Sequence, residues 1–328
     1  MRFGPVPLAR AEGAILAHSV ALEGGRLKKG LTLGAEDLAA LQAAGHAEVV
    51  VARLEPGDLH EDTAAARLAA ALVAPGAGLR IGKAATGRAN IFATGVGLAG
   101  IDAARIDALN AVHPMITVAT VPPWQRMAAR GMVATVKIIS YAVPEAALEA
   151  SAEAGQGALS FATPRVKRAA LIQTEAGAAV NPAKGHRAIE ERLARLDVAL
   201  DPQKVVPHEI AALSEALSAS EAEALFVLTG SATSDLFDTA PEALRRAGGT
   251  VHHFGMPVDP GNLLFHGDLG GKPVIGLPGC ARSPALNGAD WVMERLLCGV
   301  PVTPRDIAAM GVGGLLKEVP QRGRPREA

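Results

Sequence analysis

The sequence predicts a two-domain α/β protein, with a mixed α+β region over residues 1–150 and a helix-covered parallel sheet over residues 160–305. The chain has 328 residues, 49% of them hydrophobic, which is more than a single domain of roughly 100 to 150 residues requires. From residue 166 onward, short apolar runs alternate with segments of helical periodicity, as in strands joined by crossover helices. Earlier in the chain, predicted helices and strands follow one another less regularly.

The first region contains helices and β-branched strands in mixed order. Apolar positions recur at helical spacing before Gly45, and an alanine-rich segment shows the same period. The predicted helices are residues 35–46, 61–72 and 106–112, and the predicted strands are residues 48–51, 115–121 and 133–139. Residues 145–158 are rich in Ala, Glu and Gly, and Gly155 and Gly157 weaken any helix there, so we interpret them as the linker.

In the second region strands and helices alternate strictly, which predicts a parallel sheet. The predicted strands are residues 169–172, 204–206, 224–228, 251–254 and 274–277, and the predicted helices are residues 186–196, 209–217, 239–247 and 284–297. Ligands of such sheets bind outside the carboxyl ends of the strands, where Glu175, Thr229 and Pro278 are expected to lie. We expect residues 306–328 to form a flexible tail.

Composition and charge exclude several classes of function. Lys and Arg total 32 and Asp and Glu 33, so we expect no broad basic face for nucleic acid or an acidic membrane. Aromatic residues make up 3%, too few for stacking platforms on single strands. Cys280 and Cys298 form neither a disulfide framework nor a zinc spacing. With no apolar signal core and no run near the roughly 18 to 20 apolar residues of a membrane span, we expect a cytoplasmic protein.

An anion site is predicted where the strand at residues 225–228 ends. The strand continues into Thr229-Gly230-Ser231-Ala232-Thr233-Ser234, followed by Asp238 before a predicted helix. Small and hydroxyl residues in this position leave backbone N–H groups and a helix dipole facing one point, which suits phosphate. Gly230 would allow the backbone to approach that phosphate closely. A second strand ends in Gly276-Leu277-Pro278-Gly279, at the same edge if the sheet is parallel.

These residues resemble the molybdopterin-binding domain of molybdenum-cofactor biosynthesis proteins, the MoeA, MogA, gephyrin and CinA group. The blocks that carry the resemblance are Thr229-Gly230-Ser231 with Thr233 and Asp238, Asp259-Pro260-Gly261-Asn262, Leu277-Pro278-Gly279, and residues 169–175. Residues 11–17, 29–30, 37–38 and 44–45 more weakly resemble the leading region of MoeA-like proteins. Residues 276–284 and 287–291 resemble a MoeA-like subgroup associated with a nucleotidyltransferase that makes the cytosine dinucleotide form of the cofactor.

The resemblance implies a three-layer αβα parallel-sheet domain at 160–305, preceded by a smaller MoeA-like α+β region. It implies binding of molybdopterin or its nucleotide derivative and a role in maturing the molybdenum cofactor. The chain is then either an enzyme of the adenylyl-transferring or molybdenum-transferring kind that uses Mg²⁺, or a non-catalytic carrier. A carrier would pass the pterin to a nucleotidyltransferase or a molybdenum hydroxylase. Homo-oligomers are expected, since MoeA-like relatives are dimers and MogA-like relatives trimers.

The resemblance also implies a set of site residues. The implied phosphate and pterin ligands are Thr229, Gly230, Ser231, Thr233, Ser234, Gly261, Pro278, Gly279 and Arg282, with Glu175 and His208 as additional candidates. Asp238 stands where the family has an acid for nucleotide and Mg²⁺ chemistry, and a carboxylate beside phosphate oxygens suits that ion. The alternative is that Asp238 only caps the helix that begins at residue 239.

The chain departs from the family pattern at several positions. Gly255 and Asp259 stand near the turn where MoeA-like enzymes carry lysines, so capture of molybdate there is expected to be unfavourable. His208 replaces an acidic residue at the entry to a helix. Arg282 is an addition, which can make bidentate contacts to phosphate or to a pterin carbonyl, or else lie in solvent.

Two further patterns favour other functions only weakly. Residues 95–100 match the G-x-G-x-x-G dinucleotide pattern, but no acid follows about 20 residues later, so a nicotinamide-dependent oxidoreductase is a remote alternative. His252 and His253 are expected to point to opposite faces of one strand, and so not to share a metal.

Overall fold

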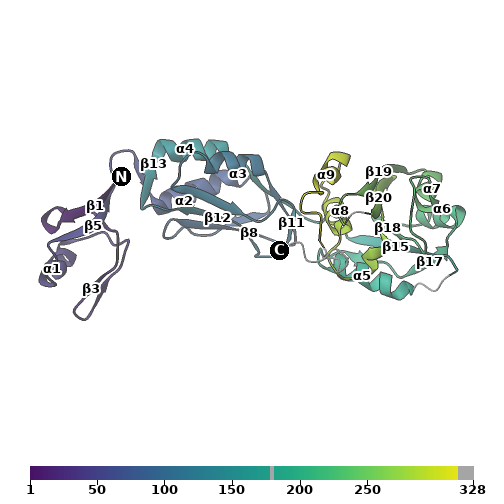
Figure 1. Ribbon diagram of the computed structural model, residues 1–328, viewed down its shortest axis with the longest axis horizontal. Coiled ribbons are helices and arrows are strands. Elements are labelled where there is room, and N and C mark those ends of the chain that lie inside the picture. Colours follow the sequence, from purple (N-terminus) through teal and green to yellow (C-terminus); the bar gives the residue numbers. More distant parts are fainter. Residues whose placement is uncertain (178–180, 260, 317–328) are drawn as a thin grey trace, which may run out of the picture. The chain divides into compact units, whose positions relative to one another are not determined.

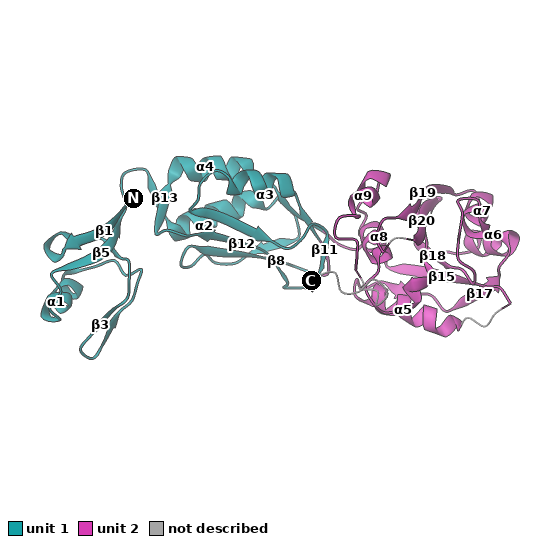
Figure 2. Cartoon of the chain, viewed as in Figure 1, with its two compact units in different colours: residues 1–95, 99–161 teal, residues 96–98, 162–328 magenta. Residues whose placement is uncertain are grey.

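A computed structural model describes residues 1–177, 181–259 and 261–316, and the chain divides into two compact units (Figure 2). Unit 1 comprises residues 1–95 and 99–161, and unit 2 comprises residues 96–98 and 162–328. Both contain helices and strands, so the protein is a mixed α/β protein (Figure 1). In the described ranges, no helix has the length and apolar character needed to cross a membrane.

The first 55 residues of unit 1, here called the N-terminal lobe, form a small β-structure with one α-helix. Its elements are β1 (Arg2–Pro7), η1 (Leu8–Arg10), β2 (Ile15–Leu16), β3 (Val20–Leu22), β4 (Gly25–Leu27), α1 (Ala35–Ala43) and β5 (Glu48–Arg53). The sheet order is β1-β5-β2, all antiparallel, and β3 and β4 form a hairpin. Leu16, Leu41 and Val51 are buried in the lobe's core. The prediction of a helix and then a strand over residues 35–51 is confirmed.

The rest of unit 1 packs three helices against antiparallel strands. Its elements, with the first two residues of β9 and the last of β14 belonging to unit 2, are β6 (Asp58–His60), α2 (Glu61–Leu72), β7 (Leu79–Ile81), β8 (Arg88–Ala93), β9 (Gly97–Ile101), α3 (Ala103–Asn110), β10 (Ile116–Thr120), β11 (Gln125–Met127), β12 (Met132–Ile138), β13 (Ala142–Pro144), α4 (Glu145–Ala154) and β14 (Leu159–Ala162). The largest sheet has the order β10-β12-β8-β7. Leu68 and Leu72 of α2 pack with Leu109 of α3 and Ile91 of β8 in one core.

Two segments of this region differ from what their glycines indicate in the sequence. The prediction of a linker over residues 145–158 is wrong, because residues 145–154 form α4, whose Leu148 is buried. Gly155 caps that helix, and a Cβ there would lie 2.4 Å from Leu109 Cδ1, so close packing rather than flexibility accounts for the glycine. The glycine pattern at residues 95–100 runs into strand β9 instead of opening a helix, which is not the strand-turn-helix geometry of a dinucleotide site.

Unit 2 is built on one seven-stranded sheet. Its elements are β15 (Arg168–Glu175), α5 (Pro182–Ala194), β16 (Ala199–Leu200), β17 (Lys204–Pro207), α6 (Ile210–Ser218), β18 (Ala224–Leu228), α7 (Thr239–Arg246), β19 (Thr250–Met256), β20 (Asn262–Leu269), β21 (Lys272–Gly276), η2 (Gly279–Arg282), α8 (Gly288–Leu297) and α9 (Pro304–Ala309). The strand order is β16-β15-β18-β21-β20-β19, with β17 also pairing with β15. Helix α9 lies partly in the segment predicted as a tail, and residues 317–328 lie outside the described ranges.

The sheet is mixed, whereas strict alternation predicted a parallel sheet. β15, β16, β17, β18 and β21 are parallel, but β20 is antiparallel to both β19 and β21. Strand β20 was not predicted from the sequence. Gly270 and Gly271 connect β20 to β21 with φ of +59° and +84°, the backbone of a two-residue hairpin turn. That glycine pair in the sequence indicates a hairpin, and could have predicted β20.

Both faces of this sheet are buried. Ile172, Leu225 and Val274 pack in one cluster with α6 and α7. The alternate residues of the same strands, such as Phe226 and Ile275, point to the opposite face and are also fully buried. Buried strands with apolar residues on both faces need cover on both sides.

A β-bulge in β19 gathers three histidines. The register of β19 against β20 shifts between Val251 and His253, and His253 lies opposite His266. The ring centroids of His252 and His253 lie 5.9 and 6.2 Å from that of His266. The expectation that His252 and His253 alternate across the strand is therefore wrong, because a bulge inserts a residue and interrupts the alternation. Among the described residues, no three ligating side chains are arranged to hold a metal ion.

We expect His266 to make unit 2 less stable as the pH falls. Burial, followed by the neighbouring His252 and His253, lowers the pKa of His266 from 6.5 to about 4. Between these values the unfolded chain binds a proton that the folded chain excludes, so the free energy of unfolding falls by up to about 1.4 kcal/mol per pH unit. Urea midpoints at several pH values should therefore drop more steeply for the wild type than for His266→Gln. Parallel pH dependences would contradict this assignment.

Candidate functional site

The carboxyl ends of four parallel strands meet at one edge of the unit 2 sheet. β15 pairs with both β17 and β18, and β18 pairs with β21, so these strand ends share one edge. The residues at or just beyond them are Glu175, His208, Thr229 and Leu277. Asn262, the first residue of antiparallel β20, lies at the same edge because Phe265 pairs with Gly276.

Thr174, which was not predicted, connects three of these strand ends. Its Oγ1 accepts the N–H of Gly230 at 3.0 Å and lies 2.8 Å from His208 Nδ1. The backbone N–H of His208 donates to the backbone carbonyl of Glu175 at 2.9 Å. The Thr174 hydroxyl and His208 Nδ1 share one hydrogen bond, in which either group can be the donor. His208 is thereby anchored at the sheet edge.

The loop after β18 keeps three backbone donors available. The N–H groups of Gly230 and Ser234 are used, by Thr174 Oγ1 and by Asp238 Oδ2. The amides at positions 231–233 have no acceptor among the described residues. The hydroxyls of Thr229 and Thr233, both buried, lie 3.4 Å apart. The part of the predicted phosphate loop that offers free amides is therefore its centre.

Asp238 caps α7. Its Oδ1 accepts the N–H of Thr239 at 2.6 Å, and its Oδ2 accepts that of Ser234 at 2.8 Å. Burial favours the neutral carboxyl, but these two backbone hydrogen bonds and nearby His208 outweigh it and hold the pKa of Asp238 below its usual value. The capping alternative considered for this residue is thus what the geometry provides.

Arg282 joins the loop to a basic cavity. Its Nη2 donates to the carbonyl of Thr229 at 2.7 Å, while its buried Nε has no partner among the described residues. Burial lowers the pKa of the guanidinium below its usual value. Arg282 also lines a cavity of about 390 Å³, together with Lys184, Arg187 and Glu191 of α5. Asn181, which also lines the cavity, caps α5 by accepting the N–H of Ala183. Three cations and one carboxylate make the cavity suitable for an anion.

A buried arginine supports the loop that carries Arg282. Arg192 of α5 forms an ion pair with Asp290 of α8, and the exposed fractions of the two side chains are only 3% and 6%. The same guanidinium donates to the backbone carbonyls of Ala281, Ser283 and Ala285, at 3.1, 2.7 and 3.0 Å. Arg192 therefore fixes residues 281–285, including the backbone on both sides of Arg282.

An asparagine pair ties the β19–β20 hairpin to the same loop. Asn287 caps α8, accepting the N–H of Ala289 at 3.0 Å and the side-chain N–H of Asn262 at 3.2 Å. Its own amide donates to Cys280 Sγ at 2.8 Å. Gly261, next to Asn262, is thereby held at the carboxyl edge, whereas Pro260 of the same predicted turn lies outside the described residues.

The structure brings most of the predicted residues to one edge but changes several local expectations. Arg282 lies in η2, because α8 begins at Gly288 and not near residue 284 as predicted. The side chain of Glu175 is exposed and forms no hydrogen bond or ion pair with the described residues. Asp259 accepts the N–H of Leu316 at 2.9 Å.

The residues that were missed had recognisable signals. Arg192 interrupts an otherwise apolar stripe of α5 that includes Ile189 and Leu193. A charge in such a stripe is either paired or misplaced. Asn287 and Asp290 have the spacing of a capping box. Lys184 and Arg187 lie near the start of α5, where helix N-termini favour anions.

Comparison with known proteins identifies no family for the whole chain. A family model described as "Domain of unknown function (DUF8806)" matches residues 5–53. No curated protein sequence matches the chain.

Solved structures with some likeness include molybdenum-cofactor proteins of Pyrococcus. A molybdopterin biosynthesis MoeA protein from Pyrococcus horikosii aligns over 93% of this chain and 75% of its own, at 13% identity and a TM-score of 0.30. A molybdenum cofactor biosynthesis protein from Pyrococcus furiosus aligns over 90% and 61%, at 12% identity and 0.24. A MoeA protein from Pyrococcus horikoshii OT3 aligns over 92% and 76%, at 9% identity and 0.26. At TM-scores this low, we infer nothing about this chain from these structures.

Proposed function

We propose that unit 2 binds the phosphate group of molybdopterin, or of its nucleotide derivative, and acts in the maturation of the molybdenum cofactor. The observation that carries the proposal is that two kinds of anion donor meet in one loop. The amides at residues 231–233 have no acceptor among the described residues, and the Arg282 guanidinium is hydrogen-bonded to the Thr229 carbonyl of the same loop. The resemblance of the blocks at residues 229–238 and 277–279 to the molybdopterin-binding family supports a pterin phosphate as the ligand.

The chemistry of the edge suits a phosphate dianion. Backbone N–H groups and a guanidinium are the donors that hold phosphate oxygens, and a guanidinium can bind two of them at once. Lys184 and Arg187, in the cavity that Arg282 lines, add positive charge that a second phosphate or a nucleotide would use. In this proposal the hydroxyls of Thr229, Ser231 and Thr233 bind the phosphate. Gly261, Pro278 and Gly279 shape the edge of the phosphate site, and His208 and Glu175 lie beside it.

We further infer that unit 2 has three layers. Helices α6 and α7 cover the face that carries Leu225 and Val274. The opposite face, which carries Phe226 and Ile275, is equally buried and so requires a layer of helices of its own. The remaining long helices of unit 2 are α5 and α8. The phosphate site would then lie where the loops between strands and helices converge.

Between the two forms of this function, the geometry around Asp238 favours a carrier. Mg²⁺ takes one or two carboxylates together with phosphate oxygens. Both oxygens of Asp238 already accept backbone hydrogen bonds, from Ser234 and Thr239, so this carboxylate is engaged in ordering the loop and capping α7. The proposed function therefore assigns it no metal. Delivery to a nucleotidyltransferase and homo-oligomerisation stay predictions.

Arg282→Gln should reduce the pterin bound by this protein at least about tenfold, because losing a hydrogen bond between charged groups costs about 1.5 to 3 kcal/mol. The full chain would be purified from a host that makes molybdopterin, and the bound pterin quantified by mass spectrometry. Arg246→Gln, at an exposed arginine of α7, is the matched control and should leave the load unchanged. A folded Arg282→Gln protein with a full load of pterin would refute the site.

Enzyme and carrier can be separated on the same preparation. With pterin and ATP added, a carrier retains the pterin without releasing pyrophosphate, whereas an adenylyl-transferring enzyme releases one pyrophosphate per adenylylated pterin. Pyrophosphate release that is lost in Asp238→Asn would overturn the preference for a carrier and restore a chemical role for this carboxylate.

A further inference from the structure

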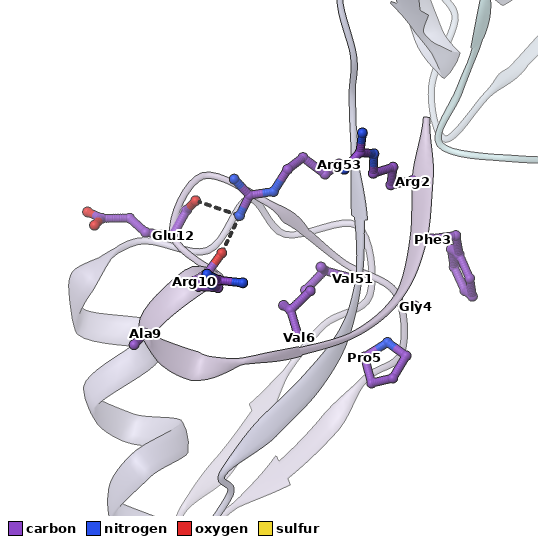
Figure 3. A pocket seen from close by; sticks show the side chains of 10 residues that line it. All are labelled: Arg2, Phe3, Gly4, Pro5, Val6, Ala9, Arg10, Glu12, Val51 and Arg53. Carbon is purple, nitrogen blue, oxygen red and sulfur yellow. Dashed lines mark hydrogen bonds between the residues drawn. The ribbon is translucent and has the colours of Figure 1, made fainter.

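The N-terminal lobe contains a hollow that the proposed function does not use. It has a volume of about 660 Å³ and is formed by β1, η1 and β5 (Figure 3). This volume lies within the roughly 300 to 1,000 Å³ typical of small-molecule sites. All of its lining residues belong to the lobe.

The floor of the hollow is apolar, and a glycine keeps it open. Gly4 of β1 lies directly opposite Val51 of β5, and Val6 lies opposite Val49. Val6 and Val51 line the hollow next to each other (Figure 3). A Cβ at Gly4 would meet no atom within 4 Å, so the space above this position is empty of protein.

Three arginines surround this floor, and they differ in the ion pairs and hydrogen bonds that they form. Arg2 and Arg53 are cross-strand partners, and Arg2 is paired with Glu55. Arg53 donates to the backbone carbonyls of Arg10 and Glu12 (Figure 3). The guanidinium of Arg10 has no acceptor among the described residues.

The charges of the hollow are therefore not balanced within the described lobe. Arg53 donates to the backbone carbonyl of Arg10, so the two arginines line neighbouring parts of the hollow. The carboxylate of Glu12 extends away from the guanidinium of Arg53 (Figure 3). An anion between the arginines would pair with both guanidinium groups, and a dianion would do so more fully than a single carboxylate.

We propose that this hollow binds a small organic molecule that carries a phosphate group. The phosphate would lie between Arg10 and Arg53, where planar guanidinium groups can each bind two oxygens. The apolar part of the molecule would cover Val6 and Val51. An added peptide strand is disfavoured as occupant, since Pro5 and Pro7 remove N–H donors from edge strand β1.

Phenyl phosphate is a suitable probe because it combines a phosphate with a small apolar group. It would be titrated into the full chain labelled with ¹⁵N at the arginine side chains, and the Nε–H signals would be followed by NMR. The signals of Arg10 and Arg53, assigned from single variants, should shift together and saturate. Because these signals differ from that of Arg282, the result is independent of phosphate binding in unit 2. Unchanged Arg10 and Arg53 signals would overturn the proposal.

Affinity would be measured by calorimetry in an Arg282→Gln background, which removes the other proposed phosphate contact. Arg10→Gln should weaken phenyl phosphate binding about tenfold or more. The control is Arg26→Gln, at an exposed arginine of β4 that does not line the hollow, and it should bind as the background does. Equal weakening in both variants would show nonspecific attraction and refute the site.

Two comparisons identify the chemistry of the occupant. Benzoate should bind more weakly than phenyl phosphate, and benzoate binding as tightly would replace the phosphate assignment with a carboxylate. Arg10→Lys, which keeps the charge but loses the planar fork, should fall between the wild type and Arg10→Gln. If Arg10→Gln does not fold, the NMR titration of the wild-type chain still decides.

Discussion

Replacing Arg192 with methionine should lower the free energy of unfolding of unit 2 by about 3 to 5 kcal/mol. The guanidinium is buried and balances the equally buried carboxylate of Asp290. Methionine fills much of the volume but leaves that carboxylate without its cation and removes the guanidinium donor from four backbone carbonyls. An uncompensated buried charge is among the most destabilising consequences of a single substitution.

Urea unfolding followed by the fluorescence of Trp291, the neighbour of Asp290 in α8, would measure this loss. Trp124 lies in unit 1, so a Trp124→Phe background isolates the signal of unit 2. Arg195→Met, on the exposed side of the end of α5, is the matched control and should change stability by less than about 0.5 kcal/mol. Similar losses in both variants would mean that the pair with Asp290 contributes little.

A functional consequence should accompany the loss of stability. Arg192 holds the carbonyls on both sides of Arg282, so its removal should free residues 281–285 even in molecules that remain folded. Pterin binding should then fall in Arg192→Met at temperatures well below its unfolding transition, while Arg195→Met keeps the wild-type load.

Gly230→Ala should destabilise unit 2 by about 1 to 3 kcal/mol and remove pterin binding with it. A Cβ on Gly230 would lie 2.7 Å from the carbonyl oxygen of Thr174 and 2.9 Å from the amide nitrogen of Ala176. Both atoms belong to the backbone, which cannot move aside as a flexible side chain would. The loops after β15 and β18 would have to separate, breaking the bond between Gly230 N–H and Thr174 Oγ1.

Gly279→Ala is the control in the same site. A Cβ at Gly279 would meet only Arg282 Nη1, at 3.5 Å, an ordinary contact. Thermal unfolding should separate the two alanine variants clearly. Equal stability of both would show that the loops adjust to a methyl group at position 230, and the close approach would then have no structural cost.

The structure changes the role assigned to Gly230. From the sequence, its lack of a side chain was taken to let the backbone approach a phosphate. In the structure the close approach is between two loops of the protein itself, and the Gly230 N–H is already used. A binding defect in Gly230→Ala would therefore report the architecture of the site, and only Arg282→Gln tests contact with the ligand.

The sequence by itself determined the strand at residues 224–228 and the loop of small and hydroxyl residues after it, and it gave capping of the next helix as one of two roles for Asp238. These features depend on local periodicity and on hydrogen bonds that span a few residues, which a linear pattern contains. It also located the Leu-Pro-Gly turn and Arg282 near the same sheet edge, because parallel strands place their ends together. The α4 helix shows the limit, since local glycines indicated a linker where packing of Leu148 decides for a helix.

Only the tertiary structure decided which groups contact one another at that edge. Arg192 and Asp290 are 98 residues apart, and Gly230 and Thr174 are 56 apart. Helical periodicity shows that Arg192 faces the core, but the register and crossing of α5 and α8 determine its partner. The bulge that collects His252, His253 and His266 is likewise a matter of register between strands. Such contacts depend on the packing of whole elements against one another, and no local pattern in the chain encodes that packing.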